Sequence, residues 1–287
     1  MKKTHICIAA AAILSFANIS CRYGLEEAFY RQSRADERAA SIKEVTLPSD
    51  LVQSLGDEYT VLVITDVHFG ANSGIKGNNR RDEDFLSSVA KLSQRPKFCI
   101  CLGDIAEHGY ESEFRDYKEK IQDKLWDELG IRTFNVVGNH DLFNTGWKYY
   151  KEVLGETTSF YRFSTKNISW YFLDSAGGSL GTTQMQSLYE AVSGDTKPKF
   201  FFTHVPLYAN GHFYFSMQNT DERNKLIVLL NQNKAKTFVA GHIHTQKSSD
   251  LGSFNEYTVN AFLADKKYGL LTVNETEGTA VPKFISY

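Results

Sequence analysis

The sequence predicts an α/β fold in which helices cover the faces of a β-sheet, and three observations support this prediction. Short runs of β-branched and aromatic residues alternate with longer segments whose apolar residues recur at helical spacing. The chain contains 15 tyrosines and 20 phenylalanines, and this abundance suits a sheet-rich core. No linker rich in Pro, Gly or Ser divides residues 59–287, so we expect one domain there.

The expected elements follow one another along this domain. Apolar runs predict strands at 59–65, 98–102, 133–137, 160–163, 168–173, 199–203, 237–240, 257–263 and 268–273. Helical periodicity predicts helices at 82–92, 111–129, 146–154, 182–192 and 221–231, with Gly130 as the C-cap of the second. Cys99 and Cys101 share one face of a strand, and we interpret them as small core residues rather than as a disulfide framework.

The N-terminal segment has the features of an export signal. Lys2 and Lys3 precede an apolar run at 6–17, which has the length of a signal sequence and is too short to span a bilayer. Residues 18–21, Asn-Ile-Ser-Cys, resemble a lipobox, which predicts a lipid-modified Cys21 and a membrane-anchored lipoprotein facing the periplasm or the cell surface. Cleavage after the small-x-small sequence at 15–17 is the alternative, and it predicts simple secretion.

The segment between the signal and the globular domain is expected to be a helical linker. We assign 1–20 to the signal peptide and 21–58 to this linker, because residues 22–45 are charged and contain no Pro, and no Gly after Gly24. The formal net charge is −2, and removal of residues 1–20 deletes two lysines and no acid, which leaves −4. A mildly acidic protein has no general attraction for nucleic acid, so we expect no stable nucleic-acid complex.

Polar residues follow five of the expected strands at the point where each strand ends. The motifs are Asp66-Val67-His68, Gly103-Asp104, Gly138-Asn139-His140-Asp141, His204 and Gly241-His242-Ile243-His244. Ligands bind at the carboxyl edge of α/β sheets, and two donors at i and i+2 after a strand lie on one side, able to reach one ion. Glycines before Asp104, Asn139 and His242 permit a tight turn and close backbone approach to a ligand. The set therefore predicts a metal site.

These five motifs together resemble those of the calcineurin-like metallophosphoesterase superfamily, over residues 59–262. The resemblance implies a four-layer α/β sandwich, in which two mixed sheets pack face to face with helices outside. It also implies a hydrolase with two metal ions. One ion would be held by Asp66, His68 and His244 and the other by Asn139, His204 and His242, with Asp104 bridging both.

The donor set and the family chemistry indicate what such a centre does. Nitrogen and oxygen ligands suit Mn, Fe or Zn. A hydroxide bridging two cations attacks phosphorus in line, and the cations neutralise the phosphate oxygens. In the family, the residue corresponding to His140 protonates the leaving group. Glu107 lies where many relatives have an Asp that orients this histidine; it is either that orienting residue or a solvated loop residue.

The substrate stays open between a phosphodiester and a phosphomonoester, nucleotides included. His108 replaces the arginine of phosphoprotein phosphatases, so the chain looks more like the bacterial branch that contains class III cyclic-nucleotide phosphodiesterases. The aromatic stretch 207–215 either stacks on a base or packs beside the site. The alternative function is a lipid-anchored binding protein that uses a catalytically retired form of the fold.

Overall fold

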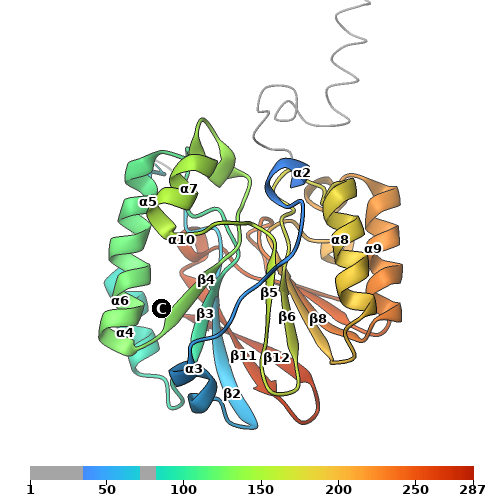
Figure 1. Cartoon of the computed structure of the whole chain (residues 1–287). Helices are drawn as coiled ribbons and strands as arrows, with labels where there is room; N and C mark the ends of the chain where they lie inside the picture. The colour runs from blue at the N-terminus through green and yellow to red at the C-terminus, as the bar shows by residue number, and fades with distance from the viewer. Residues whose placement is uncertain (1–34, 72–81) are drawn as a thin grey trace, which may run out of the picture.

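Two β-sheets face each other at the centre of the molecule, and helices cover the outer face of each (Figure 1). The computed structural model describes residues 35–71 and 82–287. One sheet contains, in spatial order, β12 (Thr279–Ser286), β11 (Lys267–Asn274), β2 (Glu58–Ile64), β3 (Phe98–Cys101) and β4 (Arg132–Asn135). The other contains β1 (Lys43–Glu44), β5 (Tyr161–Ser164), β6 (Ser169–Phe172), β7 (Lys199–Thr203), β8 (Ala235–Ala240), β10 (Asn255–Thr258) and β9 (Lys247–Asp250).

Both sheets are mixed, which confirms the predicted sandwich. Strands β2, β3 and β4 are parallel, and β11 joins β2 in the antiparallel direction. In the larger sheet β6, β7, β8 and β10 are parallel, whereas β5 and β9 pair antiparallel to β6 and β10. Five strands precede the polar motifs. Among these, β2, β3 and β4 are parallel to one another in the smaller sheet, and β7 and β8 are parallel in the larger sheet.

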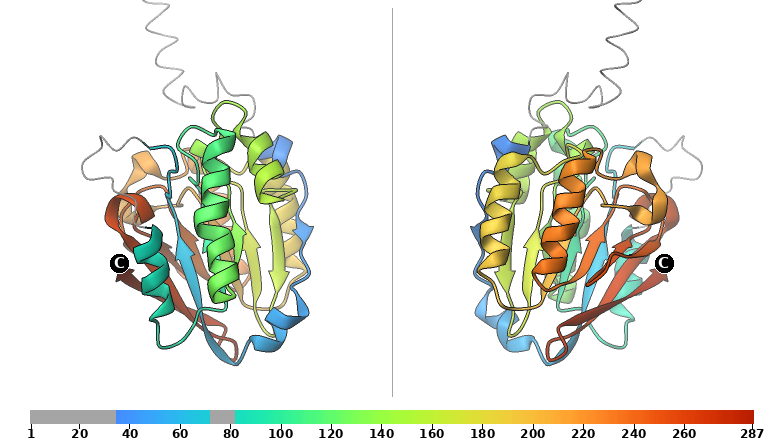
Figure 2. Two further views of the ribbon diagram at one scale, coloured as in Figure 1. Left: turned by 90° about the vertical axis from the view of Figure 1, so that its left-hand side faces the viewer. Right: turned by 90° about the vertical axis from the view of Figure 1, so that its right-hand side faces the viewer.

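Helices cover the two sheets separately, and the two side views of Figure 2 show one helical layer each. The smaller sheet is covered by α4 (Asp82–Ala90), α5 (Glu111–Tyr117), the π-helical η2 (Lys118–Gln122), α6 (Asp123–Leu129) and α7 (Gly146–Leu154). The larger sheet is covered by α8 (Thr182–Ser193) and α9 (Thr220–Gln232). Gly130 ends α6 in the left-handed conformation, as predicted.

The alternation of strand side chains builds three apolar layers. In β2, Val61 and Val63 point into the layer between the sheets, whereas Leu62 and Ile64 point into the layer under the helices. Cys99 and Cys101 lie in this second layer, buried and not disulfide-bonded. Burial on both faces explains why these strands read as continuous apolar runs.

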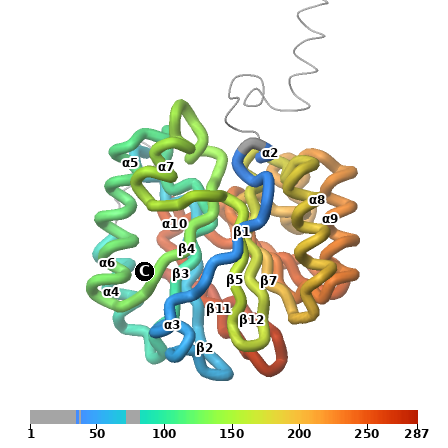
Figure 3. Tube along the Cα trace, viewed as in Figure 1, coloured from blue at the N-terminus to red at the C-terminus, as the bar shows by residue number. Residues whose placement is uncertain are grey.

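The N-terminal segment differs from its prediction. Of the helix expected at 22–45, only α2 (Ala35–Arg38) forms within the described residues, and β1 follows it and pairs with β5 (Figure 3). Arg38 donates from Nε and Nη2 to the buried carboxylate of Asp174, at 2.8 Å each. These tertiary contacts override the local helical preference, so the described part of the expected linker packs on the body. The short helix α3 (Ser49–Ser54) then leads into β2.

One further expectation is corrected in the C-terminal part. The strand expected at 257–263 is wrong at its end, because residues after β10 turn into the short helix α10 (Phe262–Asp265).

The signal peptide at 1–20 and Cys21 lie outside the described residues. Among residues 35–71 and 82–287, no helix has both the length and the apolar character needed to cross a membrane.

Candidate metal centre

The polar motifs meet at one edge of the sandwich. Each follows a strand end: Asp66 and His68 follow β2, Asp104 follows β3, Asn139 and His140 follow β4, His204 follows β7, and His242 and His244 follow β8. A hydrogen bond crosses between the two sheets here, from Nδ1 of His204 to the carbonyl oxygen of Leu102 at 2.8 Å. Both sheets therefore contribute to one site.

Several residues with unfavourable backbone conformations are clustered at this edge. Five residues of the motifs have positive φ angles, namely Asp66 (53°), His68 (48°), Asp104 (50°), His242 (68°) and His244 (55°). Positive φ is uncommon for residues other than glycine, and strained conformations persist where the surrounding structure over-determines them, often at functional sites. The tight turns aim these side chains back over the strand ends.

Two glycines allow the loops to approach one another. A Cβ atom on Gly138 would lie 2.1 Å from the backbone nitrogen of Asp104, and one on Gly241 would lie 2.0 Å from Oγ1 of Thr65. Neither position has room for a side chain, because the neighbouring backbone or buried side chain cannot move away. The sequence predicted a close approach of these glycines to a ligand, whereas here they approach the neighbouring loop and the side chain of Thr65.

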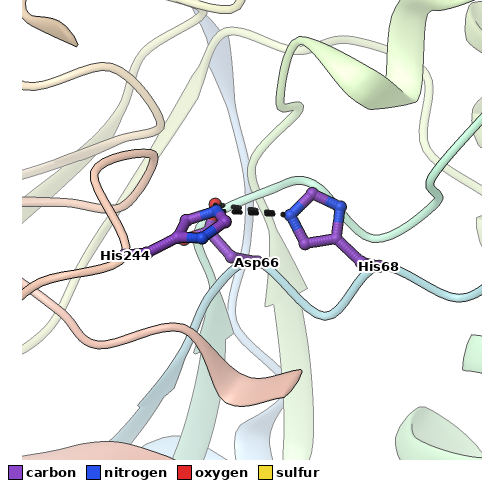
Figure 4. A group of neighbouring side chains, drawn as sticks. All are labelled: Asp66, His68 and His244. Atoms are coloured by element: carbon purple, nitrogen blue, oxygen red, sulfur yellow. Dashed lines mark hydrogen bonds and ion pairs between the residues drawn. The ribbon is translucent and has the colours of Figure 1, made fainter. Parts of the chain in front are cut away.

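A first cluster is formed by Asp66, His68 and His244, whose side chains point toward one another from two separate loops (Figure 4). Nε2 of His244 lies 3.2 Å from Oδ1 of Asp66 and 3.4 Å from Nε2 of His68. The second oxygen of Asp66 is fixed by hydrogen bonds from Oγ1 of Thr65 (2.8 Å) and the backbone nitrogen of His242 (3.1 Å). Oδ1 is thereby directed toward the two imidazoles.

A second cluster surrounds Nε2 of His204. This nitrogen lies 3.0 Å from Oδ1 of Asn139, 3.2 Å from Nδ1 of His242 and 3.3 Å from Oδ2 of Asp104. The bond to the carbonyl of Leu102 places the proton of His204 on Nδ1, so that Nε2 is available as an electron-pair donor.

Asp104 lies between the clusters. Its Oδ2 is 3.3 Å from Nε2 of His204 and 3.9 Å from Nε2 of His68. Its Oδ1 is occupied by a hydrogen bond from the backbone nitrogen of His140 at 2.8 Å. All seven side chains that the sequence indicated as ligands thus lie together, with one carboxylate oxygen shared between the two groups.

The two clusters fit metal ions. Donors bound about 2.1 Å from one ion, at tetrahedral or octahedral angles, lie roughly 3.0–3.4 Å apart, and most of the distances above fall in this range. Oδ1 of Asp66 is buried and accepts no hydrogen bond of good geometry from the described residues, so it has a lone pair open toward the cluster. The arrangement of these donors supports divalent metal binding.

The electrostatics of the cluster favour cations. Burial opposes the charge on His68, but hydrogen bonding to Glu107 and the negative charges of Asp104 and Asp66 raise its pKa to about 9. Burial likewise opposes ionisation of Asp104, yet the adjacent His204, His140 and His68 hold its pKa well below its usual range. The ionised carboxylates that favour protonated histidines would also attract metal ions, so protons and metal ions compete for the imidazole nitrogens.

His140 and Glu107 are arranged differently from the expectation. Nδ1 of His140 donates to the main-chain carbonyl of Glu107 at 2.8 Å. The Glu107 carboxylate lies 2.8 Å from Nδ1 of His68 and 3.8 Å from Nδ1 of His140. Glu107 therefore holds His140 through its backbone and His68 through its side chain, which neither sequence interpretation anticipated.

Asp141 has a role that the motif did not reveal. Its buried carboxylate accepts hydrogen bonds from the backbone nitrogens of Ala106 (2.9 Å) and Gly138 (2.8 Å). These two bonds join the loop that carries Asp104 to the loop that carries Asn139. The sequence signal was its membership of the Gly138–Asp141 motif. An Asp that is buried in such a loop usually accepts backbone hydrogen bonds.

Comparison with known proteins agrees with this geometry. The fold and the site define a metal-dependent phosphoester hydrolase. The family model for calcineurin-like phosphoesterases matches residues 59–246, and the chain belongs to this family. A protein of Fibrobacter succinogenes, named as a probable cyclic nucleotide phosphodiesterase, is 24% identical over 195 residues, which cover 66% of this chain and 73% of the relative.

Solved structures show the same fold. A dimetal phosphatase from Danio rerio has a TM-score of 0.58 at 14% identity, covering 80% of this chain and 99% of its own. The purple acid phosphatase PPD1 of yellow lupin has a TM-score of 0.55 at 14% identity, covering 81% of this chain and 54% of its own. GAP50, described as the anchor in the inner membrane complex of Plasmodium, has a TM-score of 0.54 at 15% identity, covering 80% and 84%.

Proposed function

We propose that the protein is an exported phosphoesterase with a dinuclear metal centre, in which His140 protonates the leaving group. The observation that carries this proposal is the position of Asp104. Its Oδ2 faces the imidazole of His68 on one side and that of His204 on the other, at 3.9 and 3.3 Å. A carboxylate that lies between two donor clusters would offset the repulsion between two neighbouring cations.

The ligand assignment follows the two clusters. Asp66, His68 and His244 would hold one ion, and Asn139, His204 and His242 the other, with Asp104 between them. When bound, the two ions would supply Lewis acidity at the phosphoryl oxygens and make hydroxide available near neutral pH. Mn, Fe and Zn all suit this mixed set of nitrogen and oxygen donors.

The protein's own residues provide the proton and the orientation. The carbonyl of Glu107 fixes the ring of His140 through Nδ1, so that in the imidazolium form Nε2 is the nitrogen that would donate its proton to a leaving group. His140 is partly exposed and its ring lies 4.9 Å from that of His68, centroid to centroid. It therefore lies beside the first cluster, and with His68 and Glu107 it forms a third group of possible donors. Within this group we assign His140 as the proton donor rather than as a metal ligand.

The alternative is a retired enzyme that only binds. GAP50 shows that this fold also occurs in a protein described as an anchor. In this chain, however, each side chain of the two clusters and the proton donor is present and oriented, which favours catalysis over binding alone. The name of the Fibrobacter relative supports a phosphodiester substrate, cyclic nucleotides included, although a phosphomonoester remains the second candidate.

The export part of the proposal rests on the sequence of residues 1–21. A lipid-modified Cys21 predicts that the mature protein partitions into detergent and that Cys21→Ser moves it to the soluble fraction. An intact mass that begins at Asn18 and carries no acyl chains would instead establish simple secretion.

Activity is tested by metal reconstitution. The metal-free protein is supplied separately with Mn, Fe, Zn, Ni and Co and assayed with bis(p-nitrophenyl) phosphate and p-nitrophenyl phosphate. We expect metal-dependent turnover of at least one ester, and the ratio of the two rates separates diesterase from monoesterase activity. Absence of turnover with every metal, in protein shown to bind metal, would support the binding-protein alternative.

A further inference from the structure

Three consecutive aromatic side chains are exposed in the loop that follows His204. Phe213, Tyr214 and Phe215 form the short helix η5 (Phe213–Phe215), and 54%, 91% and 54% of their respective surfaces are accessible. By contrast, Leu207 and Ala209 of the same stretch are buried. The packing interpretation of this stretch therefore holds for its beginning, while its aromatic end faces solvent.

The exposed aromatic residues follow a firmly anchored turn. The buried carboxylate of Glu256 accepts hydrogen bonds from the backbone nitrogens of Leu207 (2.5 Å) and Ala209 (2.6 Å), with a longer one from Tyr208 (3.2 Å). Ser249 accepts from the backbone nitrogen of Asn210 at 2.8 Å, within the helix η4 (Ala209–Gly211). A buried carboxylate that takes three backbone donors fixes the direction in which the following residues leave the core.

This segment adjoins the metal centre. The ring of Phe215 lies 6.3 Å from the imidazole of His242, centroid to centroid, at an interplanar angle of 64°. Phe213 is braced on the other side, since its ring packs edge-on against Tyr208 at 5.5 Å and the guanidinium of Arg223 lies 5.9 Å from its centroid. The ring of Phe215 thus borders the second cluster, and Phe213 and Tyr214 precede it in the same short helix.

We propose that this aromatic edge, with Phe215 nearest the metals, binds the planar aromatic group of the substrate, a nucleobase in particular. The proposal rests on the proposed function, because it assumes that a phosphoester occupies the metal centre. Exposed aromatic residues that follow an anchored turn beside a phosphate-binding site offer π faces on which any base can stack. Large exposed apolar groups of this kind mark binding surfaces.

The test compares two ligands that differ only in the base. They are the phosphonate analogues of AMP and of ribose 5-phosphate, in which carbon replaces the ester oxygen so that neither is hydrolysed. Binding to the metal-loaded protein is measured by titration calorimetry. Stacking of one base predicts that the adenosine ligand binds roughly 5- to 150-fold more tightly to the wild type.

Substitutions then assign this preference to the aromatic edge. Phe215→Leu keeps an apolar side chain but removes the π face, and it should reduce the preference several-fold while the affinity for the ribose ligand stays unchanged. Phe215→Trp should restore the preference. The matched control is Tyr189→Leu on α8, which alters an equally exposed aromatic residue and should leave the preference intact.

The outcomes separate this proposal from the proposed function. A wild-type preference near one, or a preference that survives both Phe215→Leu and Tyr214→Leu, would overturn the aromatic edge as a base-binding surface. If p-nitrophenyl phosphate is hydrolysed in either of those cases, the hydrolase proposal is retained and only the base-binding proposal is rejected. If neither phosphonate binds the metal-loaded protein, phosphate recognition at the centre fails and this proposal fails with it.

Discussion

Replacing Glu107 should weaken metal binding rather than proton donation. The Glu107 carboxylate lies 2.8 Å from Nδ1 of His68 but 3.8 Å from Nδ1 of His140, whereas its main-chain carbonyl holds His140. In Glu107→Ala the carbonyl remains, so His140 keeps its orientation. His68 loses the carboxylate at its Nδ1, which helps to orient its ring and raises its basicity toward a metal.

The structure sets the size of this effect. Loss of a carboxylate that supports a metal-binding histidine typically lowers metal affinity 10- to 100-fold. The side chain of Glu107 is 24% exposed, so water partly screens it and we expect about 10- to 30-fold, or about 1.4–2 kcal/mol. The affinity is measured by competition with a metal-binding dye. The control is Glu111→Ala, which removes an exposed carboxylate paired with Arg115 on α5.

The result also distinguishes two roles of Glu107. If metal affinity in Glu107→Ala stays within twofold of the wild type, and the rate falls more for alkyl than for aryl esters, then Glu107 orients the proton donor as in the family pattern. That combination would refute the inference drawn from the two distances.

Three further predictions concern catalysis and stability. His140→Ala should retain metal and slow an alkyl ester by ~10²–10⁴-fold, with a smaller loss for p-nitrophenyl esters; equal losses on both would argue against proton donation. Asp174→Ala should cost about 3–5 kcal/mol in denaturant unfolding, because it removes one member of a buried ion pair with Arg38, and a loss under ~1 kcal/mol would contradict this. Burial raises the pKa of Glu156 to about 7, so its neutral form favours folding below about pH 5 and this contribution declines as pH rises through 7. Glu156→Gln should remove up to about 3 kcal/mol of that decline, and parallel stability curves for the two proteins would exclude it.

The sequence carried most of the information about the strands and the cluster. Residues buried on both sheet faces produce uninterrupted apolar runs, so β2, β3 and β7 could be located from composition alone. The polar residues that end these runs converge because parallel strands finish at a common edge. The sequence pattern was therefore sufficient to predict that the seven side chains meet.

Other features depend on tertiary geometry that the pattern does not contain. Strand β1 has two exposed residues and exists because it pairs with β5, so no apolar run announces it. The Glu107 carboxylate lies 2.8 Å from Nδ1 of His68 and 3.8 Å from Nδ1 of His140, so a small difference in loop geometry decides which histidine it binds. The exposure of Phe213–Phe215 likewise depends on the anchoring of the preceding turn by Glu256, which lies 47 residues or more beyond that turn in the sequence.

The metal content of Asp104→Asn tests the dinuclear centre most directly. The wild type, reconstituted and freed of loose metal, should hold two ions per chain by elemental analysis. Because Oδ2 of Asp104 is shared by both clusters, Asp104→Asn should lose tight binding at both positions while the protein stays folded. Two tightly held ions in the variant would contradict the shared carboxylate, and a single ion in the wild type would contradict the dinuclear centre itself.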